Sequence, residues 1–272
     1  MSELYVNVGG TWKTASNYYV NVNGTWKEGS ELHAKVSSAW KQSSASSAYS
    51  GTSGIVSTNI VLDLNATISN SYGGSGTTWT DISGNSNNGT LVNGVAYSSD
   101  DSGYLVFDGS NDSISFTDDS DFNLGTGDFT YETWIQITGS GTFMRLGSFI
   151  NDSNSQASPN FTLKTDQIYM YSSLDNGYNL QKYITSSTNT WYHVVFTRIG
   201  TDVKLYRNGS LIDTANNVST NFADDRLVIG RNHFNTAYGT GHMAQARLYK
   251  GKGLTASEVL QNYNATKATY GY

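Results

Sequence analysis

The sequence predicts an all-β protein in which short β-hairpin repeats precede an antiparallel β-sandwich with one short C-terminal helix. Three observations predict this fold class. The 272 residues are rich in Gly, Ser, Thr, Asn and Tyr, with one proline and 14% charged residues, which favours short strands joined by polar turns. A short phrase recurs at the start of the chain. The remainder shows short alternating apolar and polar runs rather than helical periodicity.

The N-terminal region, residues 1–41, contains three copies of that phrase. Its tryptophans fall at positions 12, 26 and 40, a period of 14. A repeat this short cannot bury a core within itself, so neighbouring elements must cover it. The copies are Tyr5-Val-Asn-Val-Gly-Gly-Thr-Trp-Lys13, Tyr19-Val-Asn-Val-Asn-Gly-Thr-Trp-Lys27 and the weaker His33-Ala-Lys-Val-Ser-Ser-Ala-Trp-Lys41.

Each full copy predicts a hairpin that turns at Gly9-Gly10 or Asn23-Gly24, because these dipeptides tolerate the positive φ of tight turns. A two-residue loop places Val8 opposite Thr11 and Asn7 opposite Trp12. Isolated hairpins are marginally stable in water. The repeats are therefore interpreted either as surface hairpins packed on the large domain or as a fibrous, trimeric anchor.

The phrase resembles the repeats of the "YVKVNGTWK" type in bacteriophage tail fibres and other virion appendages. The third copy departs from that pattern, with His33 in place of Tyr and Ser37-Ser38 at the turn. The resemblance implies that residues 1–41 bind other virion proteins and form a homo-oligomer, with a trimer favoured.

Residues 42–54 are almost entirely small and polar, which is typical of a flexible linker. A large domain, residues 55–272, follows.

The large domain is predicted to be built from antiparallel strands, since its alternating runs are separated by turn signals. One helix is expected near the end, where Thr255-Ala-Ser-Glu258 reads as a capping box and Val259, Leu260 and Tyr263 follow on one side. The expected strands include Ile60–Leu64, Gly89–Val92, Gly103–Phe107, Ser113–Phe116, Phe129–Ile137, Trp191–Arg198, Val203–Tyr206, Ser210–Ile212, Arg226–Ile229 and Met243–Tyr249.

The order of these runs resembles the laminin-G-like family, which has a concanavalin A-like jelly roll. The resemblance implies that fold for residues 55–272. Where that family often has Asp-Glu-Val-Arg, this chain has Ala244-Gln-Ala-Arg247, so no role of the acidic pair carries over. The matching segments are Asp81–Gly89, Phe107–Phe116, Gly127–Trp134, Trp191–Phe196, Leu205–Gly209, Leu227–Gly230, Arg247–Tyr249 and Leu254–Glu258.

Catalysis is not expected. Glycan-cleaving enzymes need two carboxylates at close spacing, but the large domain has two glutamates, Glu132 and Glu258, and the second belongs to the helix cap. An acid pair among its aspartates is the alternative. The sequence also lacks a Gly-x-Ser-x-Gly elbow, a P-loop and a zinc-binding helix. His193 is interpreted as a hydrogen-bonded structural histidine.

Calcium is the expected cofactor, bound by loop oxygens. Members of the resembled family often bind calcium near their loops, which makes Asp81, Asn85, Asp108 and Asp112 the candidate ligands. The alternative is that these residues form Asx-turns.

Two predicted loops combine aromatic platforms with hydrogen-bonding groups, as glycan sites do. One runs from Tyr169 to Tyr178 and the other from Arg231 to His242. The candidate ligand-binding residues are Tyr169, Tyr171, Tyr178, His233, Asn235 and Tyr238.

The net charge of −6 argues against nucleic acid as a partner, and no run of apolar residues is long enough for membrane insertion. There is no cysteine. The start of the chain predicts no signal peptide.

The N-terminal repeats and the jelly-roll resemblance together favour a virion appendage protein of a bacteriophage, made in the host cytoplasm and displayed on the virion surface to adhere to glycans. The alternatives are a purely structural capsid or tail subunit and a bacterial extracellular lectin-like adhesin.

Overall fold

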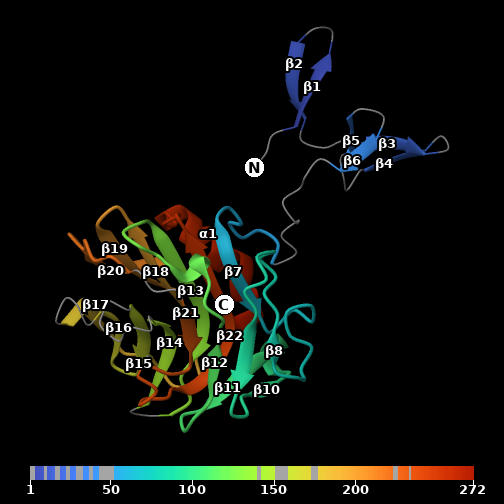
Figure 1. Cartoon of the computed structure of the whole chain (residues 1–272). Coiled ribbons are helices and arrows are strands. Elements are labelled where there is room, and N and C mark those ends of the chain that lie inside the picture. The colour runs from blue at the N-terminus through green and yellow to red at the C-terminus, as the bar shows by residue number, and fades with distance from the viewer. Residues whose placement is uncertain are drawn as a thin grey trace. The chain divides into compact units, whose positions relative to one another are not determined.

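The computed structural model describes residues 52–139, 142–150, 159–172, 177–222, 226–232 and 234–272, and six short strands within residues 4–42. For these six strands and for residues 177–179 the backbone alone is described. The chain divides into two compact units, residues 1–48 and 49–272, both drawn in Figure 1.

The first unit contains the three predicted hairpins. They are β1 (Leu4–Val8) with β2 (Thr11–Ala15), β3 (Tyr19–Val22) with β4 (Thr25–Glu28), and β5 (His33–Val36) with β6 (Ala39–Gln42). The predicted register is confirmed, because Val8 pairs with Thr11 and Asn7 with Trp12. The third copy also pairs as a hairpin despite its Ser37-Ser38 turn sequence.

The second unit is a sandwich of two antiparallel sheets, each with eight strands among the described residues (Figure 1). The first sheet has the order β10-β11-β22-β13-β18-β19-β20, and β7 also pairs with β22. Its strands are β7 (Ile60–Asn65), β10 (Ala96–Ser98), β11 (Tyr104–Asp108), β13 (Phe129–Gln136), β18 (Trp191–Ile199), β19 (Asp202–Arg207), β20 (Ser210–Ala215) and β22 (Thr240–Lys250).

The second sheet has the order β17-β16-β15-β14-β21-β12-β9-β8. Its strands are β8 (Thr78–Trp79), β9 (Gly89–Val92), β12 (Ser113–Ser115), β14 (Phe143–Ile150), β15 (Asn160–Lys164), β16 (Gln167–Ser172), β17 (Gly177–Tyr183) and β21 (Arg226–Ile229). Strands distant in sequence are neighbours here, as where β21 joins β14 to β12. The predicted all-β sandwich is confirmed.

The main core lies between the sheets and is supplied by alternate residues of each strand. On β13, Phe129 and Tyr131 are fully buried in this core, whereas Glu132 and Trp134 face the opposite side, because successive side chains of a strand alternate between its faces. That opposite side is also buried, because the C-terminal segment covers it: Trp134 Nε1 donates a 2.8 Å hydrogen bond to Thr266 Oγ1.

The described residues contain one α-helix, α1 (Ala256–Thr266), as predicted. Its capping box is present: Thr255 Oγ1 accepts from the Glu258 backbone N–H, and Glu258 accepts from the Thr255 backbone N–H. The buried stripe is Val259, Asn262 and Thr266, whereas Leu260, predicted on the same side as Val259, is 45% exposed.

Three 3₁₀ turns complete the described elements: η1 (Asp100–Ser102), η2 (Ser120–Phe122) and η3 (Lys267–Tyr270). Over the part of the chain described, none of the helices combines the length and the apolar character needed to cross a bilayer.

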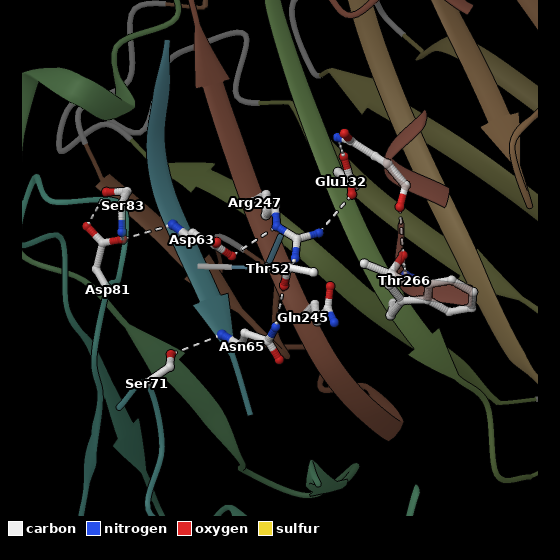
Figure 2. A network of polar contacts seen from close by, with 12 residues as sticks. Thr52, Asp63, Asn65, Ser71, Asp81, Ser83, Glu132, Gln245, Arg247 and Thr266 are labelled. Carbon is white, nitrogen blue, oxygen red and sulfur yellow. Dashed lines mark hydrogen bonds and ion pairs between the residues drawn. The ribbon is translucent and has the colours of Figure 1, made fainter. Parts of the chain in front are cut away.

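The beginning of the second unit is held by buried polar groups (Figure 2). Thr52 Oγ1 accepts hydrogen bonds from Asn65 Nδ2 at 3.0 Å and from Arg247 Nη2 at 3.1 Å. The backbone carbonyl of Gly54 accepts one from Gln261. Thr52 and Gly54, which the sequence analysis places in the linker, therefore contact the sandwich.

Candidate functional site

Four strands at one edge of the second sheet carry a transverse row of polar side chains. Register pairs Arg145 on β14 with Thr162 on β15, Thr162 with Tyr169 on β16, and Tyr169 with Gln181 on β17. Paired residues of antiparallel strands share a face, so all four side chains lie on the same face. It is the outer face, because the alternate residues of these strands point into the main core. These core residues are Met144, Leu163, Ile168, Met170 and Leu180.

Arg145 is the anchored cation of this row. Its Nη1 donates to Thr162 Oγ1 at 2.7 Å and to Tyr169 Oη at 3.1 Å. Its guanidinium carbon lies 4.8 Å from the centroid of the Phe143 ring. Nε is buried and has no acceptor among the described residues. A buried donor without an acceptor costs free energy. A ligand on the surface would meet the partly exposed part of the side chain and not Nε.

A second row lies beside the first on the same face. Gln167 pairs with Tyr183, and Gln181 Nε2 donates to Gln167 Oε1 and, at 3.3 Å, to Tyr183 Oη. The Tyr183 side chain is 70% exposed. Lys164 Nζ lies 5.6 Å from the centroid of the Tyr169 ring. An exposed aromatic ring beside amide groups and cations matches the apolar faces and polar edges of a sugar.

The structure brings the predicted tyrosines of this sheet together. Tyr169 and Tyr171 lie on β16, and Tyr171 pairs with Asn160 on one side and with Tyr178 on the other. The side chain of Tyr178 lies outside the described residues. Tyr169 is only 5% exposed, so its hydroxyl orients Arg145 and its ring is not an open platform.

The second predicted segment begins and ends beside the same row. The Gly230 backbone N–H donates to the Arg145 carbonyl at 3.0 Å, and a Cβ on Gly239 would lie 2.8 Å from the Arg145 backbone nitrogen. Within the loop, Tyr238 Oη donates to Asn235 Oδ1 at 2.6 Å. His233 lies outside the described residues. The loop that follows β21 is thus adjacent to β14 at Arg145.

The Asp81 carboxylate is engaged by hydrogen bonds within the protein, and Asn85 is oriented by hydrogen bonds of its amide group. Asp81 is 7% exposed, and its carboxylate accepts hydrogen bonds from the backbone of Asp63, Ser83 and Asn87 and from the Ser83 hydroxyl. Asn85 donates through Nδ2 to the Ile60 carbonyl and to Ser83. This arrangement fits the Asx-turn interpretation better than a calcium ligand set.

Asp108 and Asp112 flank the turn between β11 and β12. Asp108 Oδ1 accepts from the backbone of Ser110 and Asn111, which lowers the pKa of Asp108. Burial and the neighbouring Asp108 carboxylate raise the pKa of Asp112. A cation near this pair would relieve their repulsion. However, the described residues contain no cluster of three or more His, Cys, Asp or Glu side chains able to hold a metal.

A second set of charges lies under α1, away from solvent (Figure 2). Arg247 donates to Asp63 Oδ1 at 3.0 Å and to Glu132 Oε1 at 2.9 Å. Asn262 donates to Glu132 Oε2 at 2.7 Å. His193 Nε2 lies 3.1 Å from Glu132 Oε1, without the alignment of a hydrogen bond. Burial alone would raise the pKa of Glu132, but His193, Arg247 and Asn262 outweigh burial and lower it to about 2.

This buried network joins helix to sheet. Asp63, Glu132, His193 and Arg247 are each at most 1% exposed, so no substrate reaches them in this conformation. Glu258, the other glutamate of the domain, pairs with Lys252 at 2.7 Å and completes the capping box of α1.

Because both glutamates are engaged in these contacts, the outer face of β14–β17 is the candidate binding surface. Sequence reasoning missed Arg145, Gln181 and Tyr183, because their alignment across strands has no signal along the chain.

Known proteins share this architecture. A family model described as the concanavalin A-like lectin/glucanases superfamily matches residues 108–260. No curated protein matches the chain. The binding domain of Paraclostridial mosquitocidal protein 1 superposes with a TM-score of 0.59 at 20% identity over 77% of this chain and 52% of that one.

Two further structures were determined with bound partners. Domain 4 of AbnA, an extracellular arabinanase of Geobacillus stearothermophilus in complex with arabinotriose, has a TM-score of 0.56 at 18% identity and covers 74% of this chain and 97% of the domain. The binding domain of botulinum neurotoxin DC, in complex with rat synaptotagmin II, has a TM-score of 0.59 at 13% identity, covering 77% and 52% respectively.

The chain spans about half the length of the toxin binding domains it matches. At these identities the superpositions show the shared fold alone. The family match extends over more than half of the chain, from β11 to α1, and agrees with the two-sheet sandwich described above. This protein therefore belongs to the concanavalin A-like lectin/glucanases superfamily.

Proposed function

We propose that the protein is a glycan-binding module and that it binds sugars on the outer face of β14–β17. The observation that carries this proposal is the aligned row of Arg145, Thr162, Tyr169 and Gln181, with the exposed Tyr183 beside it. Thr162 and Tyr169 are buried, so the groups offered to a ligand are the Arg145 cation that they hold, the Gln181 amide and the exposed Tyr183 ring. Lectin sites use such groups to fix a sugar ring. The arabinotriose complex of the similar AbnA domain supports this reading.

Binding without cleavage is the proposed mode of action. Both glutamates of the domain are engaged, Glu132 in the buried network and Glu258 in the helix cap. Glycoside hydrolysis requires an accessible carboxyl pair. A glycan array probed with the full chain tests the proposal: retention of at least one glycan class, reduced by Tyr183→Ala, supports it, and an empty array contradicts it.

The biological setting proposed is a bacteriophage virion appendage. The three hairpins within residues 4–42 support an attachment or oligomerisation role for that region. Several displayed copies convert weak single-site binding into useful avidity. Immunogold electron microscopy of purified particles tests the setting, and particles without label contradict it. The glycan proposal does not depend on that result.

A further inference from the structure

The chain carries a net charge of −6, yet the strands that form the candidate surface contain no Asp or Glu. Strands β14–β17 contain three cations, Arg145, Lys164 and Lys182. Two of these, Arg145 and Lys164, flank the same Tyr169 ring system on the outer face. The strands of this surface therefore contribute cations and no carboxylate, and the exposed Asp166 in the turn between β15 and β16 is the one described carboxylate of the turns that join them. Cations presented in this way attract anions.

Neither Arg145 nor Lys164 forms an ion pair with a described carboxylate. The ion pairs within the described residues use other cations, as in Arg226 with Asp118 and Lys252 with Glu258. Arg145 and Lys164 both retain partial exposure. A ligand anion arriving here would not have to displace a protein carboxylate.

The geometry of Arg145 leaves one of its nitrogens for an anion. Nη1 is held, because it donates to Thr162 and Tyr169. Nε has no acceptor, but it is buried. A ligand anion would therefore meet Nη2 of this partly exposed side chain through a charge-assisted hydrogen bond.

We propose that this surface selects sugars that carry a carboxylate, such as uronic acid residues, through Arg145 with support from Lys164. The inference rests on the proposed glycan-binding function and specifies its ligand class. In this arrangement Arg145 receives the carboxylate, Lys164 adds charge, and Tyr183 receives the apolar face of the sugar ring.

The experiment measures binding of the full chain to oligogalacturonate by calorimetry, beside the same oligosaccharide with its carboxyl groups reduced to alcohols. We expect the acidic form to bind and the reduced form not to bind. Arg145→Gln should weaken binding roughly 10- to 100-fold, as loss of a charged hydrogen bond does. Arg145→Lys should recover only part of it, since lysine lacks the planar set of donors with which arginine contacts Thr162, Tyr169 and a ligand at once.

The matched control is Lys204→Gln, which removes one charge from β19 in the other sheet and should leave affinity unchanged. Circular dichroism establishes that each variant is folded; if Arg145→Gln is not, Lys164→Gln replaces it, with a smaller expected loss.

Equal binding of acidic and reduced forms, unaffected by Arg145→Gln, overturns the carboxylate inference and leaves the glycan proposal standing. Equal Arg145-dependent binding of dextran sulfate, which has no carboxylate, also overturns it. Absence of binding to any glycan, neutral arabinan included, removes the proposed function itself.

Discussion

Asn262 of α1 donates a 2.7 Å hydrogen bond to Glu132 of β13, a residue 130 positions earlier in the chain. The same asparagine accepts a hydrogen bond from the Val56 backbone N–H. Glu132 in turn receives Arg247. One side chain thus joins the last helix, the first residues of the sandwich and the central strands, and this contact organises the side of the first sheet that faces away from the core.

Glu132→Gln should destabilise the protein by about 3–5 kcal/mol, because it leaves Arg247 buried with one fewer anionic partner. Urea denaturation followed by tryptophan fluorescence measures the effect. Glu258→Gln is the matched control: it removes a partly exposed carboxylate from the helix cap and should cost about 1 kcal/mol. Equal losses for the two variants would contradict the network's role.

Stability should fall in acid through Glu132. Its pKa is lowered from an ordinary value of 4.5 to about 2 in the folded protein, so its contribution is complete above pH 4.5 and disappears as the pH falls toward 2. Urea midpoints measured between pH 7 and pH 2.5 test this. The decline should be shallower in Glu132→Gln, and parallel curves for the two proteins would be inconsistent with the assignment.

Tyr183→Ala should weaken glycan binding about tenfold and leave the melting temperature unchanged, because the ring is 70% exposed and contributes little to the core. Calorimetry with a glycan retained on the array measures it. Leu211→Ala, which removes an exposed side chain from β20 in the other sheet, should alter neither property. A large fall in melting temperature for Tyr183→Ala would show a structural role instead.

Calcium remains a prediction, and the structure favours Asp108 and Asp112 over Asp81 and Asn85 as its ligands. We expect calcium chloride to raise the melting temperature of the full chain and Asp112→Asn to abolish that rise. Burial and the neighbouring Asp108 carboxylate raise the pKa of Asp112, and a bound cation would offset both. Asp81→Asn should lower stability without abolishing the calcium response. A melting temperature indifferent to calcium would remove the prediction.

The full chain should self-associate, whereas a version beginning at Tyr49, the first residue of the second unit, should be monomeric. The hairpins have apolar residues on both faces and need a partner to cover them. Light scattering gives the two masses. Beginning at residue 55 is unsuitable, because Thr52 contacts Arg247 and Asn65. Equal association states would count against an anchoring role.

Local patterns in the sequence were sufficient for much of the fold. Alternation of apolar and polar residues located the strand β13, the Thr255–Glu258 capping box located α1, and the turn dipeptides predicted the hairpin register. These features depend on residues a few positions apart. Leu260 shows the limit: helical periodicity allowed it a buried position, but the packed stripe contains the polar Asn262 instead, because Glu132 offers it a hydrogen bond.

By itself, the sequence determined the all-β class, the positions of ten strands of the sandwich and the helix cap. It did not predict β14–β17, and it placed Tyr169 and Tyr171 in a loop, whereas both lie on β16. Only the tertiary structure decided that Arg145, Thr162, Tyr169 and Gln181 form one row, and that Arg247 lies between Asp63 and Glu132. The physical reason is that turn and strand preferences act locally, whereas cross-strand register and burial depend on which distant segments pair.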